Sequence, residues 1–64
     1  MEPISRAVAR YTYDKEEENE LTFAENDAID ILAKLEDDWW LARRRNEYGL
    51  VPSNYFQEVS SMTI

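Results

Sequence analysis

The sequence predicts one small domain built mainly from short β-strands, and three observations lead to this expectation. Its 64 residues are enough for a single domain at most. Several short segments alternate apolar with polar residues, as half-buried strands do. Turn-forming residues separate these segments. Because a domain of this size buries only about 60% of its unfolded surface, we expect it to act through its surface rather than through a deep cavity.

The first half of the chain alternates strand-like segments with turns. Residues 6–13 alternate small apolar and aromatic residues with polar ones, which predicts a strand. Residues 14–20 contain five carboxylates and no apolar residue, which predicts an exposed loop. The alternation returns at residues 21–23, and Asn26-Asp27 is a turn signal because asparagine tolerates a positive φ angle.

Residues 28–45 fit two patterns. Apolar residues recur there at helical spacing, at Ala28, Leu32, Leu35, Trp39 and Ala42. Ile29, Ile31 and Ala33 alternate with their neighbours, which suits a strand, and the isoleucines and tryptophans favour strand locally. The pattern alone leaves both alternatives open.

The segment after residue 44 predicts a hairpin. Residues 45–46 suit a two-residue turn, and residues 48–51 suit a strand that ends at Pro52. Gly49, the only glycine, lies inside that strand, where glycine often marks a bulge or a close approach of backbone. Residues 53–54 can then begin a single helical turn.

Trp39 and Trp40 are the most informative neighbours in the chain. In a strand, consecutive side chains point to opposite faces, so the two indoles cannot share one small core. One of them must face outward, and a large apolar ring at a surface usually marks a contact site. The pair therefore indicates a binding protein.

The residue types exclude several classes of function. The chain lacks cysteine and histidine, which removes disulfides, zinc sites, serine triads and the commonest general base. We expect no metal, no cofactor and no enzymatic activity, because no buried site is available to shift the carboxylate pKa values. The net charge of −7 opposes binding to nucleic acid. We expect the one basic run, Arg43-Arg44-Arg45, to be a solvated hairpin tip.

The sequence also bears on the location of the chain. No apolar run reaches the roughly 18 residues of a membrane span. Residues 1–5 lack the basic start and apolar stretch of a signal peptide. We therefore expect no membrane insertion and a cytoplasmic, monomeric module that is part of a longer protein.

Four segments carry a resemblance to one known family: Ala9-Arg10-Tyr11-Thr12-Tyr13, Glu20-Leu21-Thr22-Phe23, Asp38-Trp39-Trp40 with Ala42, and Gly49-Leu50-Val51-Pro52-Ser53-Asn54-Tyr55. They resemble, in order, four motifs of Src homology 3 (SH3) domains. These are Ala-Leu-Tyr-Asp-Tyr, the acidic-Leu-x-Phe that closes the RT loop, the Trp-Trp-x-Ala strand, and Gly-x-Val/Ile-Pro-Ser-Asn-Tyr. Each motif is weak alone, but all four at the family's spacing are specific.

The resemblance implies a small all-β barrel of five strands in two packed antiparallel sheets, with RT, n-Src and distal loops and a short 3-10 turn. It implies a domain over residues 6–59 between tails at 1–5 and 60–64, and it favours strands over 28–45. Parity puts Trp40 on the side of Ala42 and Trp39 on the other. The core should include Ala9, Leu21, Phe23, Ile29, Ile31, Ala42 and Val51.

Four positions depart from the family pattern. Arg10 and Thr12 replace the family's leucine and aspartate, and Asn26 stands where a turn glycine is usual. We expect these three to leave the fold intact. Leu50 stands where an aromatic residue is frequent at the edge of the groove, and it could reshape one pocket.

Family members bind proline-rich (PxxP) peptides in the polyproline II conformation, so the resemblance implies an aromatic groove. Tyr11 and Tyr55 should form the walls of one proline pocket. The indole N–H of Trp39 and the side chain of Asn54 should donate hydrogen bonds to ligand carbonyls. The next pocket should be formed by Tyr13, Trp39, Pro52 and Tyr55.

A third pocket should bind a basic residue of the ligand. Glu20 matches the key acidic residue of the family's RT loop, and Trp39 should form the other wall. Glu17 and Asp38 belong to acidic runs on either side of that pocket. Carboxylates pair well with arginine, so we expect peptides with Arg or Lys and binding that weakens with salt.

Two alternatives belong to other binding classes. Some SH3 domains bind folded partners such as ubiquitin through the same groove, and these tend to carry phenylalanine where this chain has Tyr55. A nucleic-acid-binding β-barrel also exposes aromatic residues, but on a basic groove. The acidic residues beside Trp39 oppose that second alternative.

Overall fold

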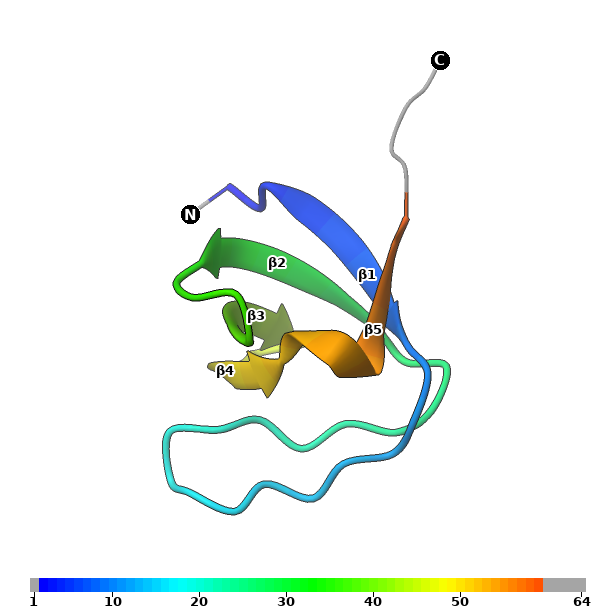
Figure 1. Ribbon diagram of the computed structural model, residues 1–64, viewed down its shortest axis with the longest axis vertical. Coiled ribbons are helices and arrows are strands. Elements are labelled where there is room, and N and C mark those ends of the chain that lie inside the picture. The colour runs from blue at the N-terminus through cyan, green and yellow to red at the C-terminus, as the bar shows by residue number, and fades with distance from the viewer. Residues whose placement is uncertain (1, 60–64) are drawn as a thin grey trace.

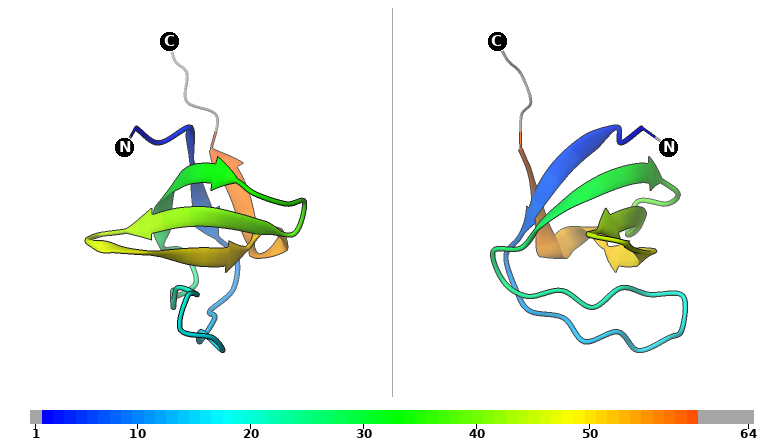
Figure 2. Two further views of the ribbon diagram at one scale, coloured as in Figure 1. Left: turned by 90° about the vertical axis from the view of Figure 1, so that its left-hand side faces the viewer. Right: turned by 180° about the vertical axis from the view of Figure 1, so that it is seen from behind.

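The computed structural model describes residues 2–59, which form one antiparallel sheet wrapped around a core (Figure 1). The strand order is β4-β3-β2-β1-β5, and Figure 2 shows the sheet curling into the expected five-stranded all-β barrel. This described part contains no helix long and apolar enough to cross a membrane. The elements are β1 (Ser5–Ala9), β2 (Ala28–Lys34), β3 (Trp39–Arg44), β4 (Glu47–Pro52), the 3-10 turn η1 (Ser53–Tyr55) and β5 (Phe56–Val59).

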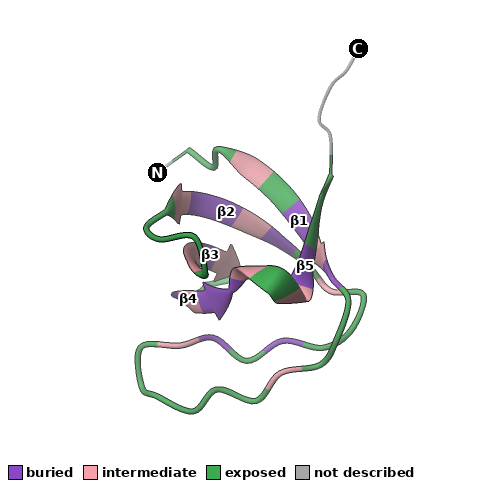
Figure 3. Cartoon of the chain, in the orientation of Figure 1, coloured by how far each residue is buried: buried purple, intermediate pink, exposed green. Residues whose placement is uncertain are grey.

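The core is formed by inward-facing residues of all five strands and of the loop between β1 and β2. All seven core residues expected from the sequence are buried. Phe23, Ile29, Ile31 and Val51 are the largest side chains that are fully buried. Ala7 and Phe56 add to the same cluster from β1 and β5. Figure 3 shows buried segments along β1, β2 and β4, whereas most of the RT loop, residues 10–27, is exposed.

Residues 28–45 form two strands, so the helical alternative for this segment is wrong. The pairing of β2 with β3 shifts register between Ile31 and Ala33. Leu32 lies at this irregularity and is buried, although simple alternation with Ile31 would expose it. A bulge changes the direction of side chains locally, and the alternating pattern alone does not reveal it.

The expected strand over residues 6–13 is wrong beyond Ala9, where β1 ends. The chain leaves the sheet there and returns at β2, and we call residues 10–27 the RT loop (bottom of Figure 1). Within this loop Tyr13 pairs with Phe23 as an isolated bridge. The expected N-terminal tail meets the sheet, because β1 begins at Ser5; the tail expected at 60–64 lies outside the described residues.

Two tight turns agree with the sequence. Asn26 adopts a φ of 76°, and its backbone N–H donates to the carbonyl of Ala9 at 2.8 Å. The distal turn consists of Arg45 and Asn46, with Arg45 at a φ of 59°. Asparagine adopts the left-handed region at modest cost, which explains why the turn at 26 forms without glycine.

Gly49 is the point at which the RT loop approaches β4. A β-carbon there would lie 2.9 Å from the carbonyl carbon of Glu20. The loop also bonds to the edge of β4: the N–H of Leu50 donates to Asn19 O at 2.8 Å, and Leu21 N–H donates to Leu50 O at 3.0 Å. The close backbone approach is therefore the correct alternative for this glycine.

The basic run 43–45 is not the solvated hairpin tip that the sequence predicted. Arg43 Nη2 lies 2.6 Å from Asp30 Oδ2, and Arg44 Nε lies 2.8 Å from Asp27 Oδ2. Both arginines are half-buried, and only Arg45 is exposed. The prediction fails because the aspartates that pair with the run lie on β2 and just before it, more than ten residues away in the sequence.

Candidate functional site

Three tyrosines gather where the RT loop meets η1, and we call Tyr11, Tyr13 and Tyr55 the tyrosine cluster. The ring of Tyr55 makes edge-on contacts with Tyr11 at 5.4 Å and with Tyr13 at 5.3 Å between centroids. Tyr13 in turn stacks on Phe23, a fully buried residue. The cluster is thus anchored to the core on one side, while Tyr11 is 55% exposed on the other.

Backbone contacts fix the position of this cluster. The N–H of Arg10 donates to the carbonyl of Tyr55 at 2.7 Å, which joins the start of the RT loop to η1. Pro52 precedes η1 with a φ of −72°, an angle that proline favours before a helical turn. Pro52 itself is buried.

Trp39 begins β3 directly opposite Pro52 and is half-buried. The preceding n-Src loop, residues 35–38, is tied to η1 by Ser53. The Ser53 N–H donates to Asp38 O at 2.9 Å, and its hydroxyl donates to Asp37 O at 2.7 Å. This role of Ser53 was not predicted from the sequence, although the place of Ser53 in the motif after Pro52 was a signal.

Trp40 lies on the other side of the strand, as parity predicted. Its ring packs against the core near Phe56, with 6.5 Å between centroids. The ammonium group of Lys34 lies 4.9 Å from the centre of its ring. Trp40 is therefore mainly a packing residue, held between the core and a surface cation.

Glu20 has a structural role that the sequence did not indicate. Its Oε1 accepts a hydrogen bond from the Tyr13 hydroxyl at 2.6 Å and another from Glu16 N–H at 2.9 Å. The bond from Tyr13 is the main reason why the pKa of Glu20 lies below its ordinary value. The same bond raises the pKa of Tyr13. Glu20 thus ties two parts of the RT loop together and orients Tyr13 of the tyrosine cluster.

The remaining predicted residues lie at the margins of this surface. Glu17, Asp38 and Asn54 are exposed, and within residues 2–59 no hydrogen bond involves their side chains. The acidic runs 16–18 and 36–38 are exposed as well. The structure therefore brings the three tyrosines and Glu20 together by direct contact and pairs Trp39 with Pro52, with carboxylates exposed in both flanking loops.

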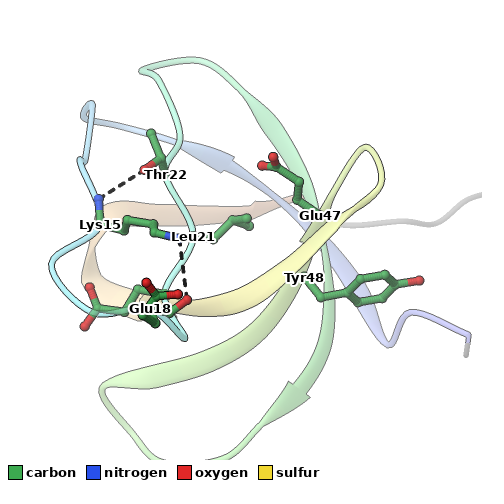
Figure 4. A pocket seen from close by; sticks show the side chains of 7 residues that line it. Lys15, Glu18, Leu21, Thr22, Glu47 and Tyr48 are labelled. Atoms are coloured by element: carbon green, nitrogen blue, oxygen red, sulfur yellow. Dashed lines mark hydrogen bonds between the residues drawn. The ribbon is translucent and has the colours of Figure 1, made fainter.

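A hollow of about 480 Å³ lies between the RT loop and β4, and Glu20 is one of the residues that line it (Figure 4). Lys15 crosses it, with its N–H donating to Thr22 Oγ1 at 3.1 Å and its ammonium group donating to Glu18 O at 3.5 Å. None of the tyrosine cluster lines it. The bonds within this hollow help to hold the shape of the RT loop.

Comparison with known proteins agrees with this architecture. The family model for the SH3 domain matches residues 8–53. The chain is 41% identical over 59 residues to the myosin IC heavy chain of Dictyostelium discoideum, covering 89% of this chain and 5% of that protein. It is 51% identical over 51 residues to an actin-binding protein of Saccharomyces cerevisiae, covering 77% of this chain and 9% of that protein.

A solved structure shows the same fold. The myosin I SH3 domain of Acanthamoeba, bound to Acan125, superposes with a TM-score of 0.85 at 36% identity. The match covers 91% of this chain and all of that one. The family match, the relatives and the fold agree: this chain belongs to the SH3 domain family.

Proposed function

We propose that this domain binds proline-rich peptides in the polyproline II conformation. The observation that carries the proposal is the tyrosine cluster, anchored on Phe23 and open to solvent at Tyr11, with Trp39 and Pro52 paired beside η1. A polyproline II helix has three residues per turn and no internal hydrogen bonds, so it presents proline ridges and free carbonyls. Aromatic rings fit those ridges, and docking costs little entropy because the helix is already stiff.

Asn54 and the Trp39 indole are the proposed donors to ligand carbonyls. Asn54 is exposed in η1, and within the described residues its amide group makes no hydrogen bond that would have to break on binding. Trp39 is half-buried, so its ring can pack against a proline and still reach the ligand with its N–H.

The proposed pocket for a basic residue lies between the RT loop and Trp39. Glu20 uses one carboxylate oxygen for the RT loop, and Oε2 accepts no hydrogen bond from the described residues. The lowered pKa of Glu20 keeps this carboxylate charged across the neutral range. Glu17 and Asp38 add exposed negative charge in the two flanking loops, which supports a preference for Arg or Lys in the peptide.

The relatives indicate the kind of protein in which this domain would act. The chain spans between 5% and 9% of the two curated relatives described above, a myosin heavy chain and an actin-binding protein. The Acanthamoeba domain is bound to a protein partner, Acan125. We infer a monomeric interaction module of a longer, actin-associated cytoplasmic protein, with avidity supplied by neighbouring modules.

The test is an NMR titration with two PxxP peptides that differ only in one residue, arginine or leucine. We expect the arginine peptide to shift the Trp39 indole and the Asn54 amide, with roughly micromolar affinity, corresponding to about 6 to 8 kcal/mol. Glu20→Gln keeps an acceptor for Tyr13 but removes the charge. It should weaken the arginine peptide and leave the leucine peptide nearly unchanged.

Three outcomes would contradict the proposal. If Glu20→Gln weakened both peptides equally, Glu20 would not form a pocket that selects a basic residue. If NMR signals shifted only on addition of ubiquitin, the ligand would be a folded protein and not a proline-rich peptide. Tight binding to single-stranded DNA at low salt would make the aromatic surface a nucleic-acid site.

A further inference from the structure

A row of polar side chains crosses the sheet at the end opposite Trp39, and the proposed groove does not use it. Residues directly opposed in neighbouring strands point to the same face of a sheet. One such line of opposed residues runs across β1, β2, β3 and β4, and we call it the arginine row: Arg6, Asp30, Arg43 and Tyr48.

Asp30 fixes the two arginines of this row. Arg6 Nε lies 3.2 Å from its Oδ1, and Arg43 Nη2 lies 2.6 Å from its Oδ2. The bonds from Arg43 are the main reason why the pKa of Asp30 is lowered, so the carboxylate stays ionised. Two guanidinium groups share one carboxylate, which leaves one positive charge uncompensated. Each guanidinium has five N–H donors, and these contacts use only some of them.

Arg45 extends the positive surface from the distal turn. It is exposed, and its side chain forms no ion pair with residues 2–59. Its φ of 59° is a conformation in which a side chain with a β-carbon costs about 1 to 2 kcal/mol. Turn geometry therefore does not explain an arginine here, because glycine or asparagine would fit the turn better.

These residues line one hollow of about 520 Å³: Arg6, Ala28, Asp30, Arg43, Arg45, Asn46 and Tyr48. Tyr48 is 58% exposed, and Figure 4 shows its ring extending away from Lys15 and Glu18 in the RT loop. The neighbouring ion pair of Arg44 with Asp27 adds no net charge. Four arginines and two aspartates give this surface a charge of +2 in a chain of −7, so the other residues carry −9.

We propose that the arginine row and Arg45 form a second binding site, for a short acidic peptide segment of a partner protein. Uncompensated guanidinium donors bind carboxylates in a charge-assisted and often bidentate way. Tyr48 offers an exposed aromatic surface beside them. A short segment is favoured because charges are screened within about 8 Å at physiological salt. A longer polyanion, such as a membrane surface or a nucleic acid duplex, would also meet the acidic remainder of the domain.

The test is a titration of the ¹⁵N-labelled 64-residue chain with a short blocked peptide of alternating glutamate and serine, at about 50 mM NaCl to limit screening. We expect shifts at Arg43, Arg45 and Tyr48, and none at the Trp39 indole. Arg45→Gln should weaken the acidic peptide about 1.5-fold to 5-fold, the range of an exposed ion pair. It leaves the bonds to Asp30 intact, so it avoids a folding defect.

The matched control is Arg10→Gln, which makes the same charge change at an exposed arginine outside the row. The site is overturned if this control weakens the acidic peptide as much as Arg45→Gln does. It is also overturned if a peptide with glutamine in place of glutamate binds equally well. If the signals of the arginine row shifted with protein concentration in the absence of peptide, the site would bind a second copy of this chain instead. If the domain sedimented with phosphatidylserine vesicles but did not respond to the peptide, the arginine row would bind a lipid surface instead.

Discussion

The two proposed binding surfaces are built in different ways, although β3 contributes to both. At one end of this strand Trp39 pairs with Pro52, the residue that precedes η1. At the other end Arg43 belongs to a row set by the register of β1 to β4. The first surface depends on loop contacts such as that of Tyr13 with Glu20. The second depends on strand pairing, on the ion pairs of Asp30 and on the distal turn, so a change in the RT loop should damage the first surface and spare the second.

The largest expected effect comes from destabilising the barrel, which carries both surfaces. Ile31 is fully buried in β2, and Ile31→Ala should lower the free energy of unfolding by about 2 to 5 kcal/mol. Urea denaturation measures this change. Leu35→Ala, at a side chain that is 58% exposed, is the control and should change the free energy of unfolding by no more than about 0.5 kcal/mol. Similar losses in both variants would mean that the burial of Ile31 does not hold the barrel together.

Trp39→Ala should remove the groove alone. We expect at least about 2 kcal/mol less binding free energy for the proline-rich peptide, roughly a 30-fold loss, with the fold retained. Calorimetric titration and circular dichroism measure the two parts of this prediction. Trp40→Ala is the matched control, because that ring packs on the core, and it should lower stability more than affinity. An unfolded Trp39→Ala variant would show that this residue is structural.

Gly49→Ala should affect the proline-binding surface and not the arginine row, because it displaces the RT loop. The new β-carbon would meet loop backbone at 2.9 Å, so the loop must move, at a cost of about 1 to 3 kcal/mol. We expect weaker binding of the proline-rich peptide and unchanged shifts of the Arg6 and Arg43 side chains in NMR spectra. Changes of equal size at both surfaces would mean that the loop and the sheet are coupled.

Acid should loosen the RT loop through Glu20. A carboxyl group with a lowered folded pKa contributes stability that is present above its unfolded pKa and is lost as the pH falls through the folded value. Glu20→Gln should therefore lose less stability than the wild type between neutral and acidic pH. The amide of Glu16, which donates to Glu20, should show the same transition in NMR spectra. Identical acid sensitivity of both proteins would exclude this contribution.

Much of the fold could be predicted because alternation and motif spacing fix which residues face inward. Ala42 of β3 and Val51 of β4 were expected in the core from the family resemblance, and both are buried, whereas Pro52 is buried out of alternation with Val51. The bulge that buries Leu32 and the end of β1 at Ala9 could not be predicted, since both depend on how neighbouring strands pair. Local patterns do not contain that information.

The candidate site was less predictable than the fold. The motifs led to the tyrosines and Trp39, but not to the bonds of Glu20 that orient one of them. The ion pairs of Arg43 and Arg44 could not be predicted either, because their aspartate partners are distant in the sequence. Which of the nine predicted residues contact a ligand stays a prediction until a peptide is bound.

The bonds between the RT loop and Leu50 have a consequence for the association of whole molecules. An unpaired edge strand offers its N–H and carbonyl groups to strands of other chains, which is a common route to aggregation. Here Asn19 and Leu21 occupy those groups at Leu50 on the outer edge of β4. The loop that carries part of the proposed specificity therefore also protects this edge. Efforts to change ligand preference by varying residues 14–18 should retain the backbone path of residues 19–21, or solubility will be lost along with binding.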